Sequence, residues 1–189
     1  VTFSSAPVAV VLDPPEPSGV LCGVQDDGTV ECAGDGTLAG QTPFGANGYF
    51  SPVSHHLVVP TALPLLADVE FMRMGDGFAC VSTSADVQCW GDNSQRQLGQ
   101  GGPSTVDTYT PVPVLGLAAV DELAIGARHA CVRTGGSVQC WGDNTDGQVG
   151  TAAFNGDQSI PVGVPLIADA VELALGERHS RSEERRVGK

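Results

Sequence analysis

The sequence predicts an all-β protein built from repeats, and three observations carry this prediction. The decapeptide WGDNSQRQLG at 90–99 returns almost unchanged as WGDNTDGQVG at 141–150, so Trp90 and Trp141 lie 51 positions apart. A fixed period marks a repeat architecture. The 189 residues include 25 glycines and 13 prolines, which separate short alternating apolar runs. No stretch shows a 3.6-residue apolar stripe with helix caps, so short strands joined by turns are expected.

Four copies of the repeat can be aligned. The third copy, HACVRTGGSVQCWGDNTDGQVG at 129–150, and the second, at 78–99, are well kept, and a more divergent copy occupies 21–40. A fourth begins with LALGERHS at 173–180 and stops where the pattern asks for cysteine and the chain has Arg181. The expected repeat boundaries are about 21–66, 67–117, 118–167 and 168–180.

Each repeat offers about four candidate strands. One is an alternating run that ends at a glycine, as in Leu123 to Gly126, and two are the arms of a hairpin that carries the cysteines. The fourth is a Pro-Val segment such as Pro111 to Val114. Neither side of the hairpin arms is fully polar, which is typical of strands that pack on both faces. Each copy is therefore expected to form one four-stranded sheet.

The spacing of the six cysteines predicts three cross-strand disulfide bonds. A two-residue loop at Gly135-Gly136 supplies the positive φ that tight hairpin turns require, and it places Cys131 opposite Cys140. Cα atoms at a non-hydrogen-bonded pair approach to ~4.5 Å, within the ~4.4–6.8 Å that a disulfide accepts. The same register follows around Ser84-Ala85 and around the three-residue loop Asp26-Asp27-Gly28. The predicted pairs are Cys22–Cys32, Cys80–Cys89 and Cys131–Cys140.

Disulfide bonds imply an oxidising compartment, so we expect an extracellular, cell-surface or periplasmic location. Two alternatives remain open: six reduced, buried cysteines in a cytosolic protein, and a redox-active role for strained bridges. A structural zinc site fits less well, because no CxxC occurs and one hairpin offers two thiolates where about four ligands are needed. Each bridge closes a loop of ~10 residues and is expected to contribute ~2–3 kcal/mol, which braces a sheet without defining the fold.

At these residues the chain resembles the repeats of the regulator-of-chromosome-condensation family. The matching frame runs through Pro111-Val112-Pro113-Val114, Gly126 to Cys131 and Val138 to Gly150, and the resemblance extends over roughly residues 20–180. It is weaker in the second copy, where Arg96 replaces a glycine. The first copy departs further, because alanine 33 stands in place of tryptophan and glycine 36 in place of asparagine.

The resemblance implies that each repeat is a blade of a β-propeller, commonly about seven to a ring. The predicted fold is therefore an all-β partial β-propeller of about three to three and a half four-stranded antiparallel blades. We expect a fragment of a bacterial, secreted, cysteine-paired variety of the family.

The repeated decapeptide is interpreted as the turn that leaves the hairpin and returns the chain along the blade edge. Its tryptophan suits packing between blades. Its Asp-Asn pair suits a turn, because such side chains cap their own backbone and tolerate left-handed φ. Its glycines permit close backbone approach. The structural signature positions are Trp90, Gly91, Asn93, Gly99, Trp141, Gly142, Asn144, Gly147 and Gly150.

Other candidate sites are weighed against this structural interpretation. Asp143, Asn144 and Asp146 resemble part of a calcium loop, but the spacing differs from an EF-hand and no closing glutamate follows. GDGTLAG at 34–40 lacks the Lys-Ser/Thr of a phosphate-binding loop. We therefore predict no catalytic, cofactor-binding or metal-ligating residues and no cofactor.

The histidines and arginines are also expected to be structural. His129 and His179 hold equivalent repeat positions, which favours a structural role over catalysis, and His55-His56 are interpreted as a surface pair. The arginines expected to form ion pairs at blade edges are Arg128, Arg133 and Arg178.

Both ends of the chain are set apart from the repeats. Residues 1–20, with VAVVL before DPPEPSG, are interpreted as a linker or the end of a preceding element. Residues 181–189, RSEERRVGK, hold six charges and the only lysine, and they resemble a translated sequencing adapter. We expect a fragment at both ends, with the remaining blades of the full-length protein as partners. Because three and a half blades cannot close a ring, marginal stability, aggregation or assembly with another copy is expected.

The net charge of −13 falls to −15 without residues 181–189, which carry four cationic and two acidic side chains. Such a surface repels phosphate backbones, so nucleic-acid binding is disfavoured. The longest aliphatic run, Val8 to Leu12, is far shorter than the ~20 residues that span a bilayer, so membrane insertion is not expected.

The favoured function is a non-catalytic binding module of a secreted or cell-surface protein, which contacts an unknown protein or glycan through its blade loops. One alternative is nucleotide exchange on a small GTPase, the activity of the namesake of the resembling family, although no non-repeat loop here carries matching exchange residues. A second alternative is a lyase or hydrolase built on propeller loops, which fold alone does not exclude.

Overall fold

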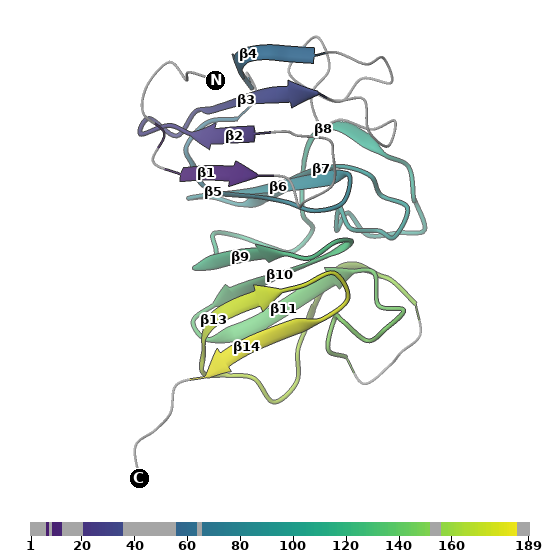
Figure 1. The fold of residues 1–189 in the computed structure, drawn as a ribbon. Helices are drawn as coiled ribbons and strands as arrows, with labels where there is room; N and C mark the ends of the chain where they lie inside the picture. The colour runs from purple at the N-terminus through teal and green to yellow at the C-terminus, as the bar shows by residue number, and fades with distance from the viewer. Residues whose placement is uncertain are drawn as a thin grey trace.

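The computed structural model describes residues 7, 9–12, 21–35, 56–63, 66–151 and 156–184, and these ranges contain strands and no helix. The strands form three four-stranded antiparallel sheets and one two-stranded sheet, in which every strand pairs with its neighbour in sequence (Figure 1). The protein is therefore an all-β partial β-propeller with three complete blades and half of a fourth, as predicted.

Each blade is a meander whose strands follow chain order. The first blade contains β1 (Ala9–Leu12), β2 (Leu21–Val24), β3 (Val30–Asp35) and β4 (His56–Ala62). The second contains β5 (Val69–Met74), β6 (Phe78–Thr83), β7 (Val87–Gly91) and β8 (Thr108–Pro113). The third contains β9 (Glu122–Ile125), β10 (His129–Thr134), β11 (Ser137–Gly142) and β12 (Gln158–Gly163). The half blade contains β13 (Ala170–Leu175) and β14 (Ser180–Glu184).

The first strands of consecutive blades lie beside one another. β1 contacts β5, β5 contacts β9, and β9 contacts β13, so these inner strands line the side of the stack where the blades converge (Figure 1). Blades then pack face to face, and three apolar clusters fill the spaces between them. β10 illustrates the resulting pattern: Ala130 and Val132 pack toward the second blade, whereas Cys131 between them packs toward the fourth. Both faces are buried, which explains why the hairpin arms lack a polar side.

The hairpin register follows the sequence prediction. Cys131 pairs with Cys140 and Thr134 with Ser137 around Gly135-Gly136, where both glycines have positive φ. The three disulfide bonds are present, each with a Cα–Cα distance of 4.1 Å, and no cysteine is free. This separation is close to the ~4.5 Å of a non-hydrogen-bonded antiparallel pair.

The N-terminal end differs from the sequence interpretation of residues 1–20, whereas the interpretation of residues 181–189 stays a prediction. Ala9–Leu12 is not a preceding element, because it pairs with β2 as the inner strand of the first blade. AVVL shows neither the alternation nor the closing glycine of the other inner strands, so the alignment of the first copy started one strand late. Ser180–Glu184 forms β14 through backbone pairing with β13, which requires no particular side chain. The origin of residues 181–189 therefore stays a prediction, and 185–189 lie outside the described residues.

Candidate functional site

An antiparallel meander places its loops alternately at two opposite ends of each blade, which gives the propeller two loop faces. The face that we call the turn face holds the cysteine-hairpin turns and the links between blades: 25–29, 63–68, 84–86, 114–121, 135–136 and 164–169. The opposite signature face holds the short turns after the inner strands and the signature loops: 75–77, 92–107, 126–128, 143–157 and 176–179. Of these ranges, 64–65 and 152–155 lie outside the described residues.

On the turn face, the hairpin turn of one blade contacts the start of the next inner strand. The amide of Val69 donates to the carbonyl of Gly28 at 3.1 Å, and the amide of Ala170 donates to the carbonyl of Gly136 at 3.0 Å. Gly136 has φ +91°, and a Cβ there would lie 2.5 Å from the carbonyl oxygen of Ala168. Only glycine fits this contact, which brings charged residues of neighbouring blades together.

Carboxylates dominate the turn face. Among the described residues, the turns, the links and the first three residues of each of the inner strands β5, β9 and β13 contain no lysine or arginine. Their acidic residues are Asp26, Asp27, Asp68, Glu70, Asp86, Asp121, Glu122, Asp169 and Glu172. The charge of this face is therefore predominantly negative, and Arg133 of β10 is a cation that reaches it.

Four of these carboxylates are held by local contacts. Arg133 reaches from β10 to Glu122 at 3.0 Å and to Asp121 at 3.4 Å. Glu122 also accepts from the amide of Leu173 in the half blade at 3.0 Å, so it links two blades. Asp86 accepts from the Thr83 hydroxyl within its turn. Hydrogen bonds from the Thr29 side chain and amide lower the pKa of the exposed Asp27.

The other five carboxylates of the turn face are exposed and make no hydrogen bond or ion pair within the described part of the chain. They are Asp26, Asp68, Glu70, Asp169 and Glu172. Within the described residues, the negative charge of these five side chains is therefore uncompensated.

The signature face, in contrast, pairs charges across blades. Arg128 binds Asp76 of the preceding blade at 3.3 Å, and Arg178 binds Asp146 at 3.4 Å. The predicted ion pairing of Arg128, Arg133 and Arg178 is confirmed by these contacts and by the pairs of Arg133 on the turn face.

Each signature loop is closed by its own polar side chains. In the third blade, Asp143 accepts from the amide of Thr145 at 2.9 Å. Asn144 is fully buried and its Oδ1 accepts from the amide of Val149 at 3.1 Å, while Gln148 accepts from the amide of Asp146 at 2.9 Å. The second blade repeats this set. Asn93 accepts from the amide of Leu98, and Gln97 accepts from the amide of Gln95. The Asp-Asn-Gln pattern thus encodes a turn.

The signature glycines occupy positions of positive φ. Gly91, Gly99, Gly142, Gly147 and Gly150 all have φ between 65° and 115°. A Cβ on Gly142 would lie 2.6 Å from the carbonyl oxygen of Arg128. The second blade has Arg96 where the third has Gly147, and Arg96 adopts φ +60°, a conformation that side chains with a Cβ rarely adopt.

The signature tryptophans lie between blades. Trp141 is fully buried, and its Nε1 donates to the carbonyl of Gln97 in the preceding signature loop at 2.8 Å. A Cβ on Gly99 would lie 3.0 Å from the same nitrogen. Trp90 is buried in the cluster between the first and second blades. The sequence predicted packing aromatics, but the hydrogen bond across the interface required knowledge of which loop lies beside which ring.

His129 is buried against the half blade. Its Nε2 lies 2.9 Å from the Ser180 hydroxyl, and its ring crowds Gly126, where a Cβ would lie 2.2 Å away. Burial lowers the pKa of His129 to about 4, with a further lowering by His179 and an opposing effect of Asp143. His179 is exposed, so the equivalent positions differ in environment.

The structure adds little on the other candidates of the sequence analysis. Among the described residues, no group of three or more His, Cys, Asp or Glu side chains is placed to hold a metal ion. None of the described segments is a helix long and apolar enough to cross a bilayer. His55 and residues 36–40 of the GDGTLAG segment lie outside the described residues, as does the side chain of His56.

The repeats match a known family model. Regulator of chromosome condensation (RCC1) repeats are matched at residues 86–133 and 120–148. The chain is 30% identical over 165 residues to the human E3 ubiquitin-protein ligase HERC2, covering 85% of this chain and 3% of that protein. It is 29% identical over 135 residues to the rat probable E3 ubiquitin-protein ligase HERC4, covering 65% of this chain and 12% of that protein.

Solved structures share the fold. Human WBSCR16 superposes with a TM-score of 0.72 at 20% identity, covering 94% of this chain and 44% of that one. Prp20p of Saccharomyces cerevisiae superposes with a TM-score of 0.69 at 22% identity, covering 89% of this chain and 40% of that one. The chain thus spans less than half of each of these propeller proteins and a small part of the ligases.

Proposed function

Because the chain belongs to the RCC1 repeat family, we propose that it is a non-catalytic binding module that recognises a basic protein partner through its turn face. The five uncompensated carboxylates of that face carry the proposal. Like charges gathered on one face create a potential that attracts a complementary partner and repels other acidic molecules. The described loops of the signature face hold seven carboxylates and three arginines, and two of these arginines pair with carboxylates of the preceding blade, so that face carries less net negative charge.

Known proteins of the same fold support the proposal that the partner is a protein, but they do not identify that protein. The structure of Prp20p is described together with its binding to Gsp1p and histones, and yeast RCC1 (Prp20) has been solved with Kap60 bound to it. Those partners belong to Prp20. For this chain they support protein recognition in general, and the acidic turn face adds the expected sign of the partner's charge.

We also propose a secreted, cell-surface or periplasmic location. The three disulfide bonds support it, because such bonds persist in oxidising compartments and are rare in the cytosol. Thiol titration of the denatured, non-reduced protein from its native source should find no free thiol. Six free thiols would contradict the location and leave the binding proposal unaffected.

The binding proposal is tested with two variants that change the net charge equally. The turn-face variant is Asp68→Asn with Asp169→Asn, and the signature-face control is Asp76→Asn with Glu177→Gln. The probe is a synthetic peptide of alternating arginine and serine, titrated calorimetrically at low and at physiological ionic strength. Exposed charge contacts contribute ~0.2–1 kcal/mol each, so the turn-face variant should bind about 2- to 30-fold more weakly.

The control should bind within about twofold of the wild type, and affinity should fall with added salt. Equal weakening in both variants would show attraction to net charge alone and would contradict recognition by the turn face. Binding that is insensitive to salt would also contradict it and would favour a neutral ligand such as a glycan.

A further inference from the structure

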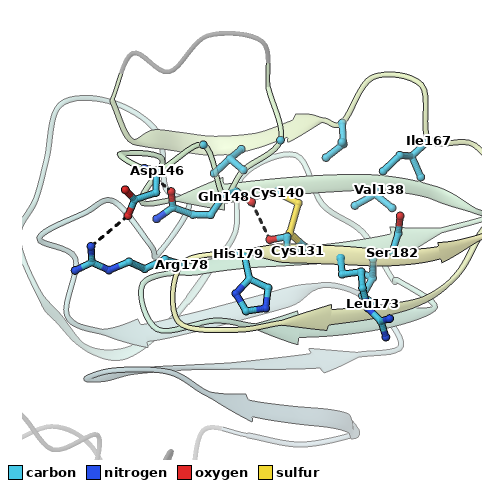
Figure 2. Close-up of a pocket in the computed structure, with 16 residues that line it drawn as sticks. Cys131, Val138, Cys140, Asp146, Gln148, Ile167, Leu173, Arg178, His179 and Ser182 are labelled. Atoms are coloured by element: carbon cyan, nitrogen blue, oxygen red, sulfur yellow. Dashed lines mark hydrogen bonds and ion pairs between the residues drawn. A yellow bond between two sulfur atoms is a disulfide. The ribbon is translucent and has the colours of Figure 1, made fainter.

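The link between the third blade and the half blade carries a fully exposed apolar residue. Leu166 lies in this link on the turn face, and its relative exposure is 101%. The next residue, Ile167, lines a pocket between the third blade and the half blade (Figure 2). Burial within the fold therefore accounts for the apolar side chain of Ile167 but not for that of Leu166.

The exposure of Leu166 is a property of its place in the link. The equivalent residue of the preceding link is Gly116, which lies between two complete blades. A Cβ at Gly116 would meet no heavy atom within 4 Å among the described residues, its chain neighbours aside. Leu115, beside it, is 58% exposed. This position of the link thus faces solvent even where the following blade is complete.

The backbone at Leu166 favours glycine. The φ of Leu166 is +69°, and that of Gly116 is +82°. Bulky residues rarely adopt φ in this range, because the Cβ crowds the backbone. Leucine is therefore strained at a position where glycine is not, and its full exposure leaves no packing within the described part of the chain to offset the strain. Residues held in such conformations gather at sites of binding.

Negative charge surrounds this leucine along the chain. Asp169 in the same link and Glu172 in the inner strand that follows are two of the five turn-face carboxylates without a partner among the described residues. Val171, between these two carboxylates, is 45% exposed. Exposed apolar and acidic residues thus alternate over 166–172. Such a surface is complementary to a basic segment that also carries an apolar side chain, and it repels an acidic one.

We propose that Leu166 is the apolar contact of the turn face, and that the partner presents a large apolar side chain among arginine or lysine residues. The inference rests on the function proposed above and specifies the chemistry of the partner. The carboxylates attract basic segments in general, and the leucine selects among them by burying apolar surface. Glycine at this position, as at Gly116, keeps the attraction and loses the selection.

The test compares two peptides of equal charge, RSRSRSRSR and RSRFRSRSR, titrated calorimetrically into the whole chain at low ionic strength. The wild type should bind the phenylalanine peptide about three- to tenfold more tightly, because the ring and Leu166 bury apolar surface against each other. Leu166→Gly should bind both peptides equally, and its affinity for the serine peptide should stay within about twofold of that of the wild type. A preference that persists in Leu166→Gly, or no preference in the wild type, would overturn the proposal.

Two controls separate a contact role of Leu166 from other effects. Val106 is 72% exposed and lies on the signature face, so Val106→Ser should keep the preference for the phenylalanine peptide. Loss of the preference in that variant would show that any exposed apolar residue produces it. Leu166→Gly should unfold at a temperature no lower than the wild type, because glycine adopts positive φ without strain. A lower unfolding temperature would assign Leu166 to the packing of the fold and contradict its role in binding.

Failure of this inference and failure of the proposed function give different results. If the turn face does not recognise basic partners, Asp68→Asn with Asp169→Asn binds both peptides as the wild type does. If only the role of Leu166 is wrong, that charge variant weakens the binding of both peptides, and Leu166→Gly leaves the ratio of the two affinities unchanged.

Discussion

The interface between the second and third blades and the interface between the third and the half blade are built from matching walls, yet only the first is closed. Leu123 is 1% exposed in the closed interface, and its counterpart Leu173 is 8% exposed in the open one. Val114 is buried, whereas its counterpart Val164 is half-buried. The following blade contributes Trp141, Ala130 and Val132 to the closed interface, whereas the half blade has Ser180 and Ser182 at the positions of the last two.

This comparison shows that each blade carries only part of its own interface. The wall comes from one repeat and the tryptophan from the next, so stability is coupled between neighbours, as in other repeat proteins. Between the third blade and the half blade, the described residues leave a pocket of about 310 Å³.

The largest expected effect comes from opening the closed interface. Trp141→Ala should destabilise the protein by about 3–5 kcal/mol, because it removes a fully buried aromatic and leaves a cavity. It also leaves the Gln97 carbonyl without its donor. Urea unfolding followed by tyrosine and Trp90 fluorescence measures the loss.

Trp141→Phe is the control, because it keeps most of the apolar volume and loses the hydrogen bond. It should cost clearly less than the alanine variant. An alanine variant as stable as the wild type would show that the two interfaces do not differ in the way the buried surface indicates.

The open interface should respond to pH through His129. Burial lowers its folded-state pKa to about 4, below the ~6.5 of the unfolded chain, so folding favours the neutral ring. The unfolded state then binds more protons between these values, and stability falls by up to about 3 kcal/mol as pH drops from 6.5 to 4. Urea unfolding at several pH values in this window measures the slope.

The matched variant is His129→Phe, since Phe78 stands at the equivalent position in the second blade. It should remove the contribution of His129 and flatten the pH dependence in that window. An unchanged slope in the variant would assign the pH dependence to other groups.

The second and third disulfide bonds provide another test of the difference between the closed and the open interface. Replacing both cysteines of either the second or third pair by alanine should cost about 2–3 kcal/mol from the unfolded-state entropy of a loop of this size. The sequence separation is 9 in both pairs, so this contribution is the same. Replacing Cys80 and Cys89 should lower the free energy of unfolding more than replacing Cys131 and Cys140, because it also leaves a cavity in the closed interface. Guanidinium unfolding of the two variants compares them, and equal costs would contradict tighter packing there.

The smallest effect concerns the two signature loops. Arg96→Gly should stabilise the protein by roughly 0.5–1 kcal/mol. A left-handed conformation costs residues with a Cβ about 1–2 kcal/mol, and glycine avoids this cost, but the greater entropy of the unfolded glycine chain offsets part of the gain. Gly147→Ala should destabilise the equivalent turn by roughly 1 kcal/mol. Thermal unfolding resolves both shifts, and a destabilised Arg96→Gly would show that contacts of the arginine side chain outweigh the backbone conformation.

The features that are local in the chain could be predicted from the amino-acid sequence alone. The repeat period gave the number of blades, and the loop between each cysteine pair set the hairpin register and hence the disulfide partners, because a two- or three-residue turn leaves one pairing. The Asp-Asn-Gln turns were equally local, since each side chain closes its own loop. The inner strand Ala9–Leu12 was missed because its sequence, AVVL, neither alternates nor ends at a glycine as the other inner strands do.

The contacts between neighbouring blades could be seen in the tertiary structure only. The donation from Trp141 to Gln97, the link from Glu122 to Leu173 and the pairing of Arg128 with Asp76 join residues 44 to 52 positions apart. The composition gave a net negative charge but not its distribution. The ion pairs across blades on the signature face, and the five carboxylates of the turn face without a partner among the described residues, depend on which loops meet. The pocket is likewise lined by residues of two blades, and periodicity alone does not place two blades in contact.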